Sequence, residues 1–258
     1  MLDSIDQFLT QGTELTLLVF AGLCLLSFVG SLIAASLGLG GGLLVLATMT
    51  LVLPPAVLIP IHGVVQIGSN GFRALIMPRH VKYAIVPAFM VGTLIGAAVG
   101  GKMVVSLDVW VLQAVLGLFV LYATWAPKFR SSDPGPAKFF GVGVVGGFGT
   151  MFVGGTGPLV APFVNAACGE RQQVVATHAT LMTFQHLFKV IAFGLLGFAF
   201  GPYIPLLVGL LLFGALGTLA GRNILNRLPE HVFRIGLRTI LTLLATRLLY
   251  EAAVGYWK

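Results

Sequence analysis

The chain has 258 residues, of which 57% are hydrophobic and only 9% are charged, and its mean hydropathy is +1.00. Soluble domains typically contain about a quarter charged residues. The composition therefore excludes an ordinary soluble domain and indicates a protein that lies almost entirely in a membrane. The net charge of +7 is interpreted as basic loops on one side of the bilayer, and nucleic acid is not expected as a partner. Cys24 and Cys168 lie far apart in apolar surroundings, so we expect both to be packing residues.

Apolar stretches separated by glycine, proline and charged residues predict ten membrane elements in an all-α integral membrane protein. The first fourteen residues contain no lysine or arginine, so the apolar stretch that follows lacks the positively charged region of a cleaved signal peptide. We expect this stretch to stay in the mature protein. In the first half, elements are expected at 15–37, 43–53, 56–76, 84–101 and 109–126. In the second half, they are expected at 138–153, 158–168, 173–199, 203–221 and 231–256.

The second and seventh elements are short, and this bears on the topology. Each has about 11 residues, enough for about 16 Å of helix, whereas the hydrocarbon core is about 30 Å thick. If all ten elements cross, three basic loops share one side, which we take as cytoplasmic. Their basic residues are Arg79 and Lys82, then Lys128, Arg130 and Lys138, then Arg222 and Arg227. We therefore predict an external N-terminus and two inverted five-element repeats, although an eight-crossing scheme stays open.

The domain division follows from this symmetry. The first membrane repeat is expected to cover 1–126, and the second is expected to cover 138–258. The segment 127–137 between them is rich in proline and charge and is expected to be a cytoplasmic linker. The whole chain is expected to be a multi-pass protein of the cytoplasmic membrane.

Glycine-rich sequence precedes both short elements, at 37–42 and at 152–158. Glycine allows a backbone to break, and a broken helix at membrane depth is tolerated where it is buried or lines a cavity. The exposed N-terminus of the following helix then favours an anion. The candidate anion-binding glycines are Gly40, Gly41, Gly155 and Gly157. The alternative is that these glycines only allow helices to pack closely.

A polar stripe occupies the third element and recurs in the eighth. His62, Gln66, Asn70 and Arg73 are spaced i, i+4, i+8 and i+11, which puts them on one helical face. Adding 116 to these numbers gives His178, Met182, His186 and Lys189, of which Met182 is the mismatch, and Gln185 falls close to the same stripe. Lipid exposure of polar side chains is costly, so such a stripe normally faces the bundle interior or a water-filled cavity.

Structural interpretations remain open for several of these residues. Either His62 or His178 alone can be a hydrogen-bonding residue between helices. Arg73 lies near the end of its element and can extend to the lipid headgroups, whereas Lys189 lies well inside its element and is expected to face a cavity. The basic residues of the last element, Arg234, Arg238 and Arg247, are given a structural role, with Glu251 as the ion-pair partner of Arg247.

The sequence offers little for catalysis or cation binding. It contains no HExxH, GxSxG or Walker A sequence and no dense carboxylate cluster, which argues against hydrolysis, metal chemistry and a cation site. No enzyme activity, metal or cofactor is therefore expected. Cationic side chains, amides and two helix N-termini instead suit a small anion.

Four segments resemble the sulfite exporter TauE/SafE family of membrane permeases, within a duplicated layout over residues 15–256. The segments are SLGLGGGLL (36–44), IPIHGVVQIGSNGFRAL (59–75), FVGGTGPLVAP (152–162) and VATHATLMTFQHLFKVI (175–191). The resemblance implies transport of sulfite, organosulfonates or related small oxyanions and organic acids across the cytoplasmic membrane.

The resulting hypothesis is an alternating-access transporter of a small sulfur-containing anion, linked to a proton or sodium, with its site between the repeats. Backbone amides at the two breaks would hold the anion, while Asn70, Gln66 and Gln185 donate hydrogen bonds and Arg73 or Lys189 supplies charge. A histidine among His62, His178 and His186 would change protonation, since free imidazole titrates near pH 6.5. The alternatives are a passive anion channel, a transporter of a small organic carboxylate, a membrane-embedded enzyme, which would need a nucleophile beside an oriented base, and a scaffold without transport activity.

Overall fold

The computed structural model describes residues 15–37, 40–125, 134–224 and 230–257, and it leaves the side chains of 37, 222–224 and 230–234 undescribed. In these ranges the structure is all-helical, with no strand. Its α-helices are α2 (Leu17–Leu37), α3 (Gly41–Met49), α4 (Pro55–Ile76), α5 (Val86–Val104), α6 (Val109–Trp125), α7 (Pro136–Val153), α8 (Gly157–Ala167), α9 (Arg171–Leu195), α10 (Ile204–Ile224) and α11 (Glu230–Tyr256). A helix therefore lies at each predicted position, while the division into two inverted repeats stays a prediction.

The two predicted short elements are short helices that follow breaks in the chain. Helix α3 has 9 residues and α8 has 11, each about half of the length that a bilayer crossing needs. Gly40 precedes α3 with φ of 97°, and Gly154 ends α7 with φ of 71°. Side chains other than glycine rarely adopt such angles, so glycine at these two positions explains where the helices break.

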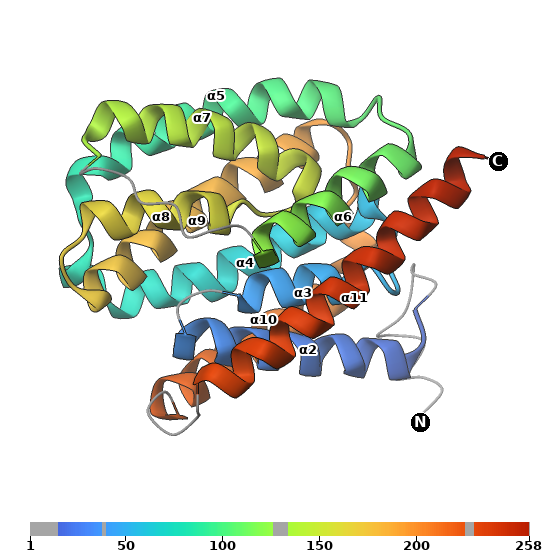
Figure 1. Ribbon diagram of the computed structural model, residues 1–258, viewed down its shortest axis with the longest axis horizontal. Helices are drawn as coiled ribbons and strands as arrows, with labels where there is room; N and C mark the ends of the chain where they lie inside the picture. The colour runs from blue at the N-terminus through green and yellow to red at the C-terminus, as the bar shows by residue number, and fades with distance from the viewer. Residues whose placement is uncertain (1–14, 38–39, 126–133, 225–229, 258) are drawn as a thin grey trace.

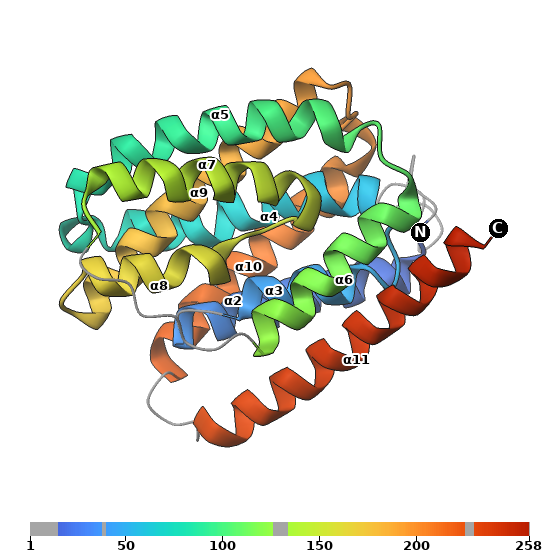
Figure 2. The same cartoon turned by 45° about the horizontal axis from the view of Figure 1, so that its top comes forward.

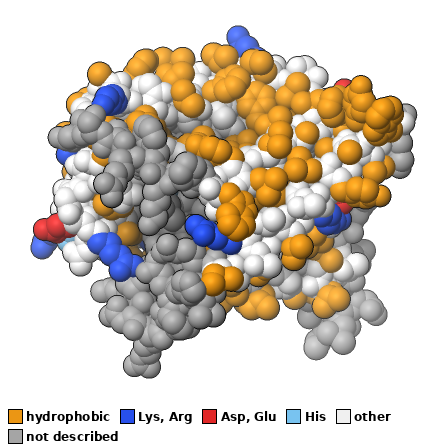
Figure 3. All heavy atoms as spheres, in the orientation of Figure 1, with side chains coloured by type: hydrophobic (Ala, Val, Ile, Leu, Met, Phe, Trp, Pro, Cys, Tyr) orange, Lys and Arg blue, Asp and Glu red, His pale blue; other side chains and the backbone are white. Residues whose placement is uncertain are grey.

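Several helices have the length and surface of membrane spans. Four meet the length and hydropathy expected of a crossing, over Leu17–Ser36, Tyr83–Val104, Pro136–Val153 and Gly201–Gly221. Large apolar side chains are exposed on these helices, for example Leu94 of α5 and Leu216 of α10, and Figure 3 shows such side chains spread over one face of the molecule. Helices α4 and α9 have 22 and 25 residues, which is long enough for a crossing, but the polar stripes lower their hydropathy.

Close helix packing encloses the polar helices. Helices α5 and α7 run side by side along one edge of the molecule, α4 and α9 lie in its middle, and α11 crosses the opposite edge (Figures 1 and 2). A Cβ atom on Gly92 of α5 would lie 2.1 Å from the Phe140 carbonyl oxygen of α7, and one on Gly217 of α10 would lie 2.1 Å from the Phe28 carbonyl oxygen of α2. The backbones of these pairs therefore touch, as small residues permit between membrane helices.

Hydrogen bonds at one end of the bundle connect several helix ends. The ammonium Nζ of Lys82 donates to the Ala167 carbonyl at 2.5 Å, and Arg171 Nη2 donates to the Ser36 carbonyl at 3.2 Å. The loop of Arg79 and Lys82 therefore lies beside the turn between α8 and α9 and near the end of α2. Of the other predicted cytoplasmic basic residues, Lys128, Arg130 and Arg227 lie outside the described residues, as does the Arg222 side chain.

Two structural expectations for polar and sulfur side chains are confirmed. Arg247 pairs with Glu251 at 2.7 Å on α11, and Cys24 and Cys168 are both buried free thiols. Arg238, on the same helix, lies over the Trp125 ring, with its Cζ 5.4 Å from the ring centroid. The side chain of Arg234 lies outside the described part.

Candidate functional site

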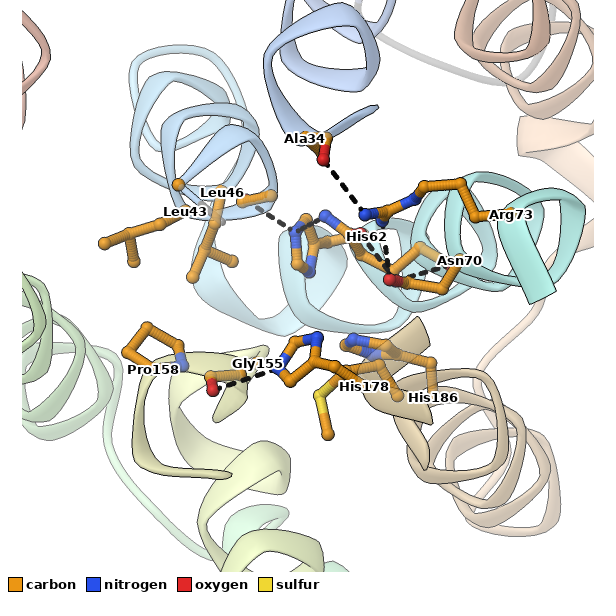
Figure 4. A pocket seen from close by; sticks show the side chains of 15 residues that line it. Ala34, Leu43, Leu46, His62, Asn70, Arg73, Gly155, Pro158, His178 and His186 are labelled. Atoms are coloured by element: carbon orange, nitrogen blue, oxygen red, sulfur yellow. Dashed lines mark hydrogen bonds between the residues drawn. The ribbon is translucent and has the colours of Figure 1, made fainter. Parts of the chain in front are cut away.

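A cavity of about 60 Å³ lies where the two short helices meet the two polar helices (Figure 4). Its lining comes from the end of α2, from α3 and α4, and from α8 and α9. The lining residues are Ala34, Gly40, Gly42, Leu43, Leu46, His62, Gln66, Asn70, Arg73, Gly155, Gly157, Pro158, His178, Met182 and His186. Sites for drug-sized ligands occupy about 300–1,000 Å³, so this cavity suits a small ion or a few waters.

The whole predicted stripe of α4 faces this cavity. His62, Gln66, Asn70 and Arg73 are each at most 6% exposed, and each contributes to the lining. The spacing of the four residues follows the helical repeat, so one rotation of α4 directs all of them to the same side. Figure 4 shows His62, Asn70 and Arg73 on this side of the cavity, opposite His178 and His186 of α9.

Arg73 is held inside the protein by neutral acceptors. Its Nε donates to the Ser69 carbonyl at 3.2 Å, its Nη1 donates to the Ala34 carbonyl at 3.2 Å, and its Nη2 donates to Asn70 Oδ1 at 2.7 Å. A guanidinium has five N–H groups, so two remain after these bonds. Arg73 therefore points into the cavity with donors available, and it does not extend to the lipid headgroups.

The amides of α4 are already engaged with one another. Asn70 Nδ2 donates to the backbone carbonyl of Gln66 at 2.9 Å and to its Oε1 at 3.0 Å, which uses both amide hydrogens. Gln66 Nε2 lies 2.9 Å from His62 Nε2. A continuous hydrogen-bonded chain thus runs from Arg73 through Asn70 and Gln66 to His62.

His62 also contacts the backbone of both glycine breaks. Its Nδ1 lies 3.2 Å from the Gly154 carbonyl oxygen, and its Nε2 lies 3.0 Å from the Gly42 carbonyl oxygen. The imidazole therefore bridges the start of α3, in the first half of the chain, and the end of α7, in the second half.

On α9 the predicted residues divide into two groups. His178 and His186 line the cavity, and His178 Nε2 lies 3.2 Å from the Gly157 carbonyl oxygen. Gln185 and Lys189 are fully buried and lie outside the lining. Lys189 Nζ donates to the Gly154 carbonyl at 2.6 Å, so this amine holds the break between α7 and α8. The expectation that Lys189 faces the cavity is therefore wrong. Of these two cations, Arg73 is the one that lines the cavity.

The predicted glycines also divide. Gly40, Gly155 and Gly157 line the cavity, whereas Gly41 does not. A Cβ atom on Gly41 would lie 1.9 Å from the Gly30 carbonyl oxygen, so Gly41 allows α3 to touch α2. The adjacent Gly42 lines the cavity instead, where the Gln66 amide lies against it.

Thr156 is a functional candidate that sequence reasoning missed. It is the N-cap residue of α8 and is fully buried. Its hydroxyl lies 3.2 Å from the Gly146 carbonyl oxygen and accepts a hydrogen bond from Gln185 Nε2 at 2.8 Å. The signal in the sequence is a hydroxyl residue inside a glycine-rich break, although this hydroxyl makes no capping hydrogen bond to the backbone of α8 and bonds α7 and α9 instead.

Thr156→Val is expected to destabilise the protein by about 1–3 kcal/mol, because it leaves the buried amide of Gln185 without its partner. Unfolding of the purified protein in detergent measures this change. Thr180→Val is the matched control, since the Thr180 hydroxyl bonds only the Ala176 carbonyl of its own helix. Equal stability of the two variants would contradict a structural role for the hydrogen bond between Thr156 and Gln185.

The cavity combines positive charge with an absence of nearby acids. No aspartate or glutamate is among the buried residues of the described chain. Arg73 is 5% exposed, and its hydrogen-bond partners in the part of the chain that the structure describes are all neutral. A buried charge without a counter-charge is costly, so the site favours an anionic ligand. In the described ranges, no group of three His, Cys, Asp or Glu side chains is arranged to hold a metal.

Comparison with known proteins identifies one family. The family model described as sulfite exporter TauE/SafE matches residues 23–248, which is most of the chain. Neither a curated protein nor a solved structure matches the chain significantly.

Proposed function

Because the chain belongs to the sulfite exporter TauE/SafE family of membrane transporters, we propose that it moves sulfite or an organosulfonate across the cytoplasmic membrane as a secondary transporter. The observation that carries this proposal is Arg73, a buried cation that lines a small cavity and has no acidic partner among the described residues. A small oxyanion supplies the missing negative charge. A small oxyanion also suits a cavity of about 60 Å³.

The contacts support a distinct role for each group. Arg73 is the cation that meets the anion, and its two remaining N–H groups suit the planar recognition of an oxyanion. His186 and His178 face the anion from α9, and the first-turn amides of α3 and α8 add positive helix ends. Asn70 has no amide hydrogen left, so it acts by orienting Arg73. Lys189 and Gln185 hold the α7–α8 break.

The same cavity supports the proposed inverted repeats over 1–126 and 138–258, joined by the linker 127–137. Each half supplies a short helix that starts at the cavity. Each half also supplies a histidine that contacts a first-turn carbonyl of that short helix, His62 with Gly42 and His178 with Gly157. Transporters built from such repeats bind substrate at the repeat interface and alternate access by moving one repeat against the other.

Flux of labelled sulfite into proteoliposomes tests the proposed function. Competition by an organosulfonate, by sulfate and by a carboxylate ranks the substrates, and an imposed proton gradient tests coupling. We expect saturable flux that sulfur oxyanions compete best and that follows the gradient.

Other results would contradict the proposal in distinct ways. Flux that does not saturate would indicate a passive anion channel. Stronger competition by the carboxylate would indicate a carboxylate transporter. An absence of flux for every anion would show that the substrate class is wrong.

A further inference from the structure

We propose that His62 is the residue that binds the coupling proton, and that Gln66 and Asn70 are positioning residues that link its protonation to the anion at Arg73. This inference rests on the proposed function, because it concerns the proton linkage of the same cavity.

His62 differs from the other two cavity histidines in its acceptors. Backbone carbonyls lie against both of its ring nitrogens, Gly154 O at 3.2 Å and Gly42 O at 3.0 Å. A carbonyl only accepts, so both contacts become hydrogen bonds only when the ring carries two N–H groups. Among the described residues, His178 has one such carbonyl, and the buried Nδ1 of His186 has no hydrogen-bond partner. The surroundings of His62 are therefore the best suited of the three to an imidazolium.

The amide of Gln66 opposes this protonated form. Its Nε2 lies 2.9 Å from His62 Nε2, so the amide N–H points to the nitrogen that a second proton would occupy. With Gln66 in this orientation, His62 is neutral and carries its hydrogen on Nδ1, where it donates to the Gly154 carbonyl. The contact between Nε2 and the Gly42 carbonyl then lacks a hydrogen.

Arg73 sets the orientation of Gln66. Side-chain amides can rotate to exchange their oxygen and nitrogen, so the network must decide between the two positions. Arg73 only donates, which requires Asn70 Oδ1 to face it, at 2.7 Å. Asn70 Nδ2 then faces Gln66 Oε1, and Gln66 Nε2 consequently faces His62. Three donor–acceptor choices in sequence connect the guanidinium to the imidazole.

Binding of an anion at Arg73 disrupts this series of hydrogen bonds. The anion binds the two remaining guanidinium N–H groups and draws the guanidinium away from Asn70 Oδ1, so that the amides of Asn70 and Gln66 are then free to rotate. His62 Nε2 takes up one proton from solvent, one N–H bond forms, and that N–H donates to the Gly42 carbonyl. The anion balances the added positive charge.

The groups that face His62 are cationic or neutral, so a proton on His62 needs the negative charge of the anion. From α9 come His186, with ring centroids 5.8 Å apart, and Lys189, which shares the Gly154 carbonyl. Arg73 lies on the same helix, and α3 and the α7–α8 break present backbone carbonyls. No acidic side chain is among the buried residues of the described ranges. A proton on His62 therefore joins a positive cluster, and the bound anion supplies the counter-charge.

Calorimetric titration of the purified full-length protein with methanesulfonate and with sulfate measures the linkage between about pH 5 and pH 8, where neither probe takes up a proton and imidazole titrates. Two buffers of different ionisation enthalpy give the number of protons taken up per anion bound. We expect uptake that approaches about one proton, and affinity that rises up to about tenfold for each unit fall in pH.

Variants separate the positioning residues from the proton site. His62→Gln is expected to bind the probes more weakly and to take up almost no proton per anion bound. Gln66→Leu is also expected to take up almost no proton, because His62 is protonated before the anion arrives, but its affinity should be at least that of the unaltered protein and should no longer rise as the pH falls. His178→Gln is expected to bind weakly but to keep the uptake per bound anion. His80→Gln, outside the cavity lining, is the control that keeps both.

Nitrogen NMR of histidine-labelled protein gives a second readout that needs no variant to fold. We expect His62 to be neutral with hydrogen on Nδ1 without anion, and to carry hydrogen on both nitrogens with anion. Anion binding without proton uptake, uptake that persists in His62→Gln, or unchanged linkage in Gln66→Leu would overturn the inference alone. No binding of either probe or of sulfite by the unaltered protein would overturn the proposed function with it.

Discussion

Arg73→Gln is expected to lower anion affinity about 30-fold to 4,000-fold and to reduce transport accordingly. The guanidinium lines the cavity, is 5% exposed and has no acidic partner among the described residues. Removing one partner of a buried charged pair typically costs about 2–5 kcal/mol, and each 1.4 kcal/mol changes affinity about tenfold. Probe titration and sulfite flux in proteoliposomes measure the loss.

Two further substitutions make this result specific. Arg73→Lys keeps the charge but loses the fork that donates to Asn70 and Ala34, so it is expected to retain part of the affinity. Arg79→Gln removes a cation from the exposed helical turn at Pro78–His80, and a change of about twofold or less is expected. If Arg73→Gln and Arg79→Gln had the same affinity, Arg73 would have no direct contact with the anion.

Gly154→Ala is expected to destabilise the protein by about 2–5 kcal/mol. The φ angle of 71° costs a residue with a Cβ atom about 1–2 kcal/mol. The new Cβ would lie 2.5 Å from Leu46 Cδ1, and such overpacking costs about 1–3 kcal/mol. Unfolding in detergent measures the sum.

Two matched variants separate the backbone part of this effect from the steric part. In Gly154→Ala with Leu46→Ala the overlap is relieved, so the double variant should be more stable than the sum of the single effects predicts. Gly155 does not have a positive φ, and a Cβ atom there would lie 3.4 Å from His186 Cε1, an ordinary contact distance. We therefore expect Gly155→Ala to lose less stability than Gly154→Ala. Equal losses at 154 and 155 would show that the break at Gly154 is not strained by a side chain.

The helices and their breaks could be predicted from the sequence because they depend on strong local signals. Apolar runs of helical length are separated by proline, glycine and charge, and Gly40 and Gly154 stand where the backbone takes a positive φ. The stripe of α4 was predicted because its residues follow the helical period, so one orientation of the helix buries them all. Periodicity decides which residues share a face.

Periodicity does not decide where a long side chain ends. Lys189 shares the stripe of His178, yet its amine reaches the Gly154 carbonyl and lies outside the cavity. Arg73, near the end of α4, stays inside because α2 offers it the Ala34 carbonyl. These outcomes depend on neighbouring helices, which the local pattern does not contain.

Adjacent positions on one helix pose the same difficulty. Gly41 and Gly42 follow each other in the first turn of α3, where successive residues point about 100° apart. Gly41 meets the backbone of α2, and Gly42 meets the Gln66 amide. The glycine-rich segment predicts that the chain breaks there, but only the packing of α3 against α2 and α4 assigns each glycine its role.

A small oxyanion is expected to bind between Arg73 of α4 and the histidines of α9. Crystals soaked in selenite, the selenium counterpart of sulfite, test it directly through the anomalous scattering of selenium. One strong selenium peak is expected in the cavity, within hydrogen-bond reach of the Arg73 guanidinium and the His186 ring, and this peak should be absent in Arg73→Gln. Selenium peaks confined to the protein surface, or a cavity peak that persists unchanged in Arg73→Gln, would contradict it.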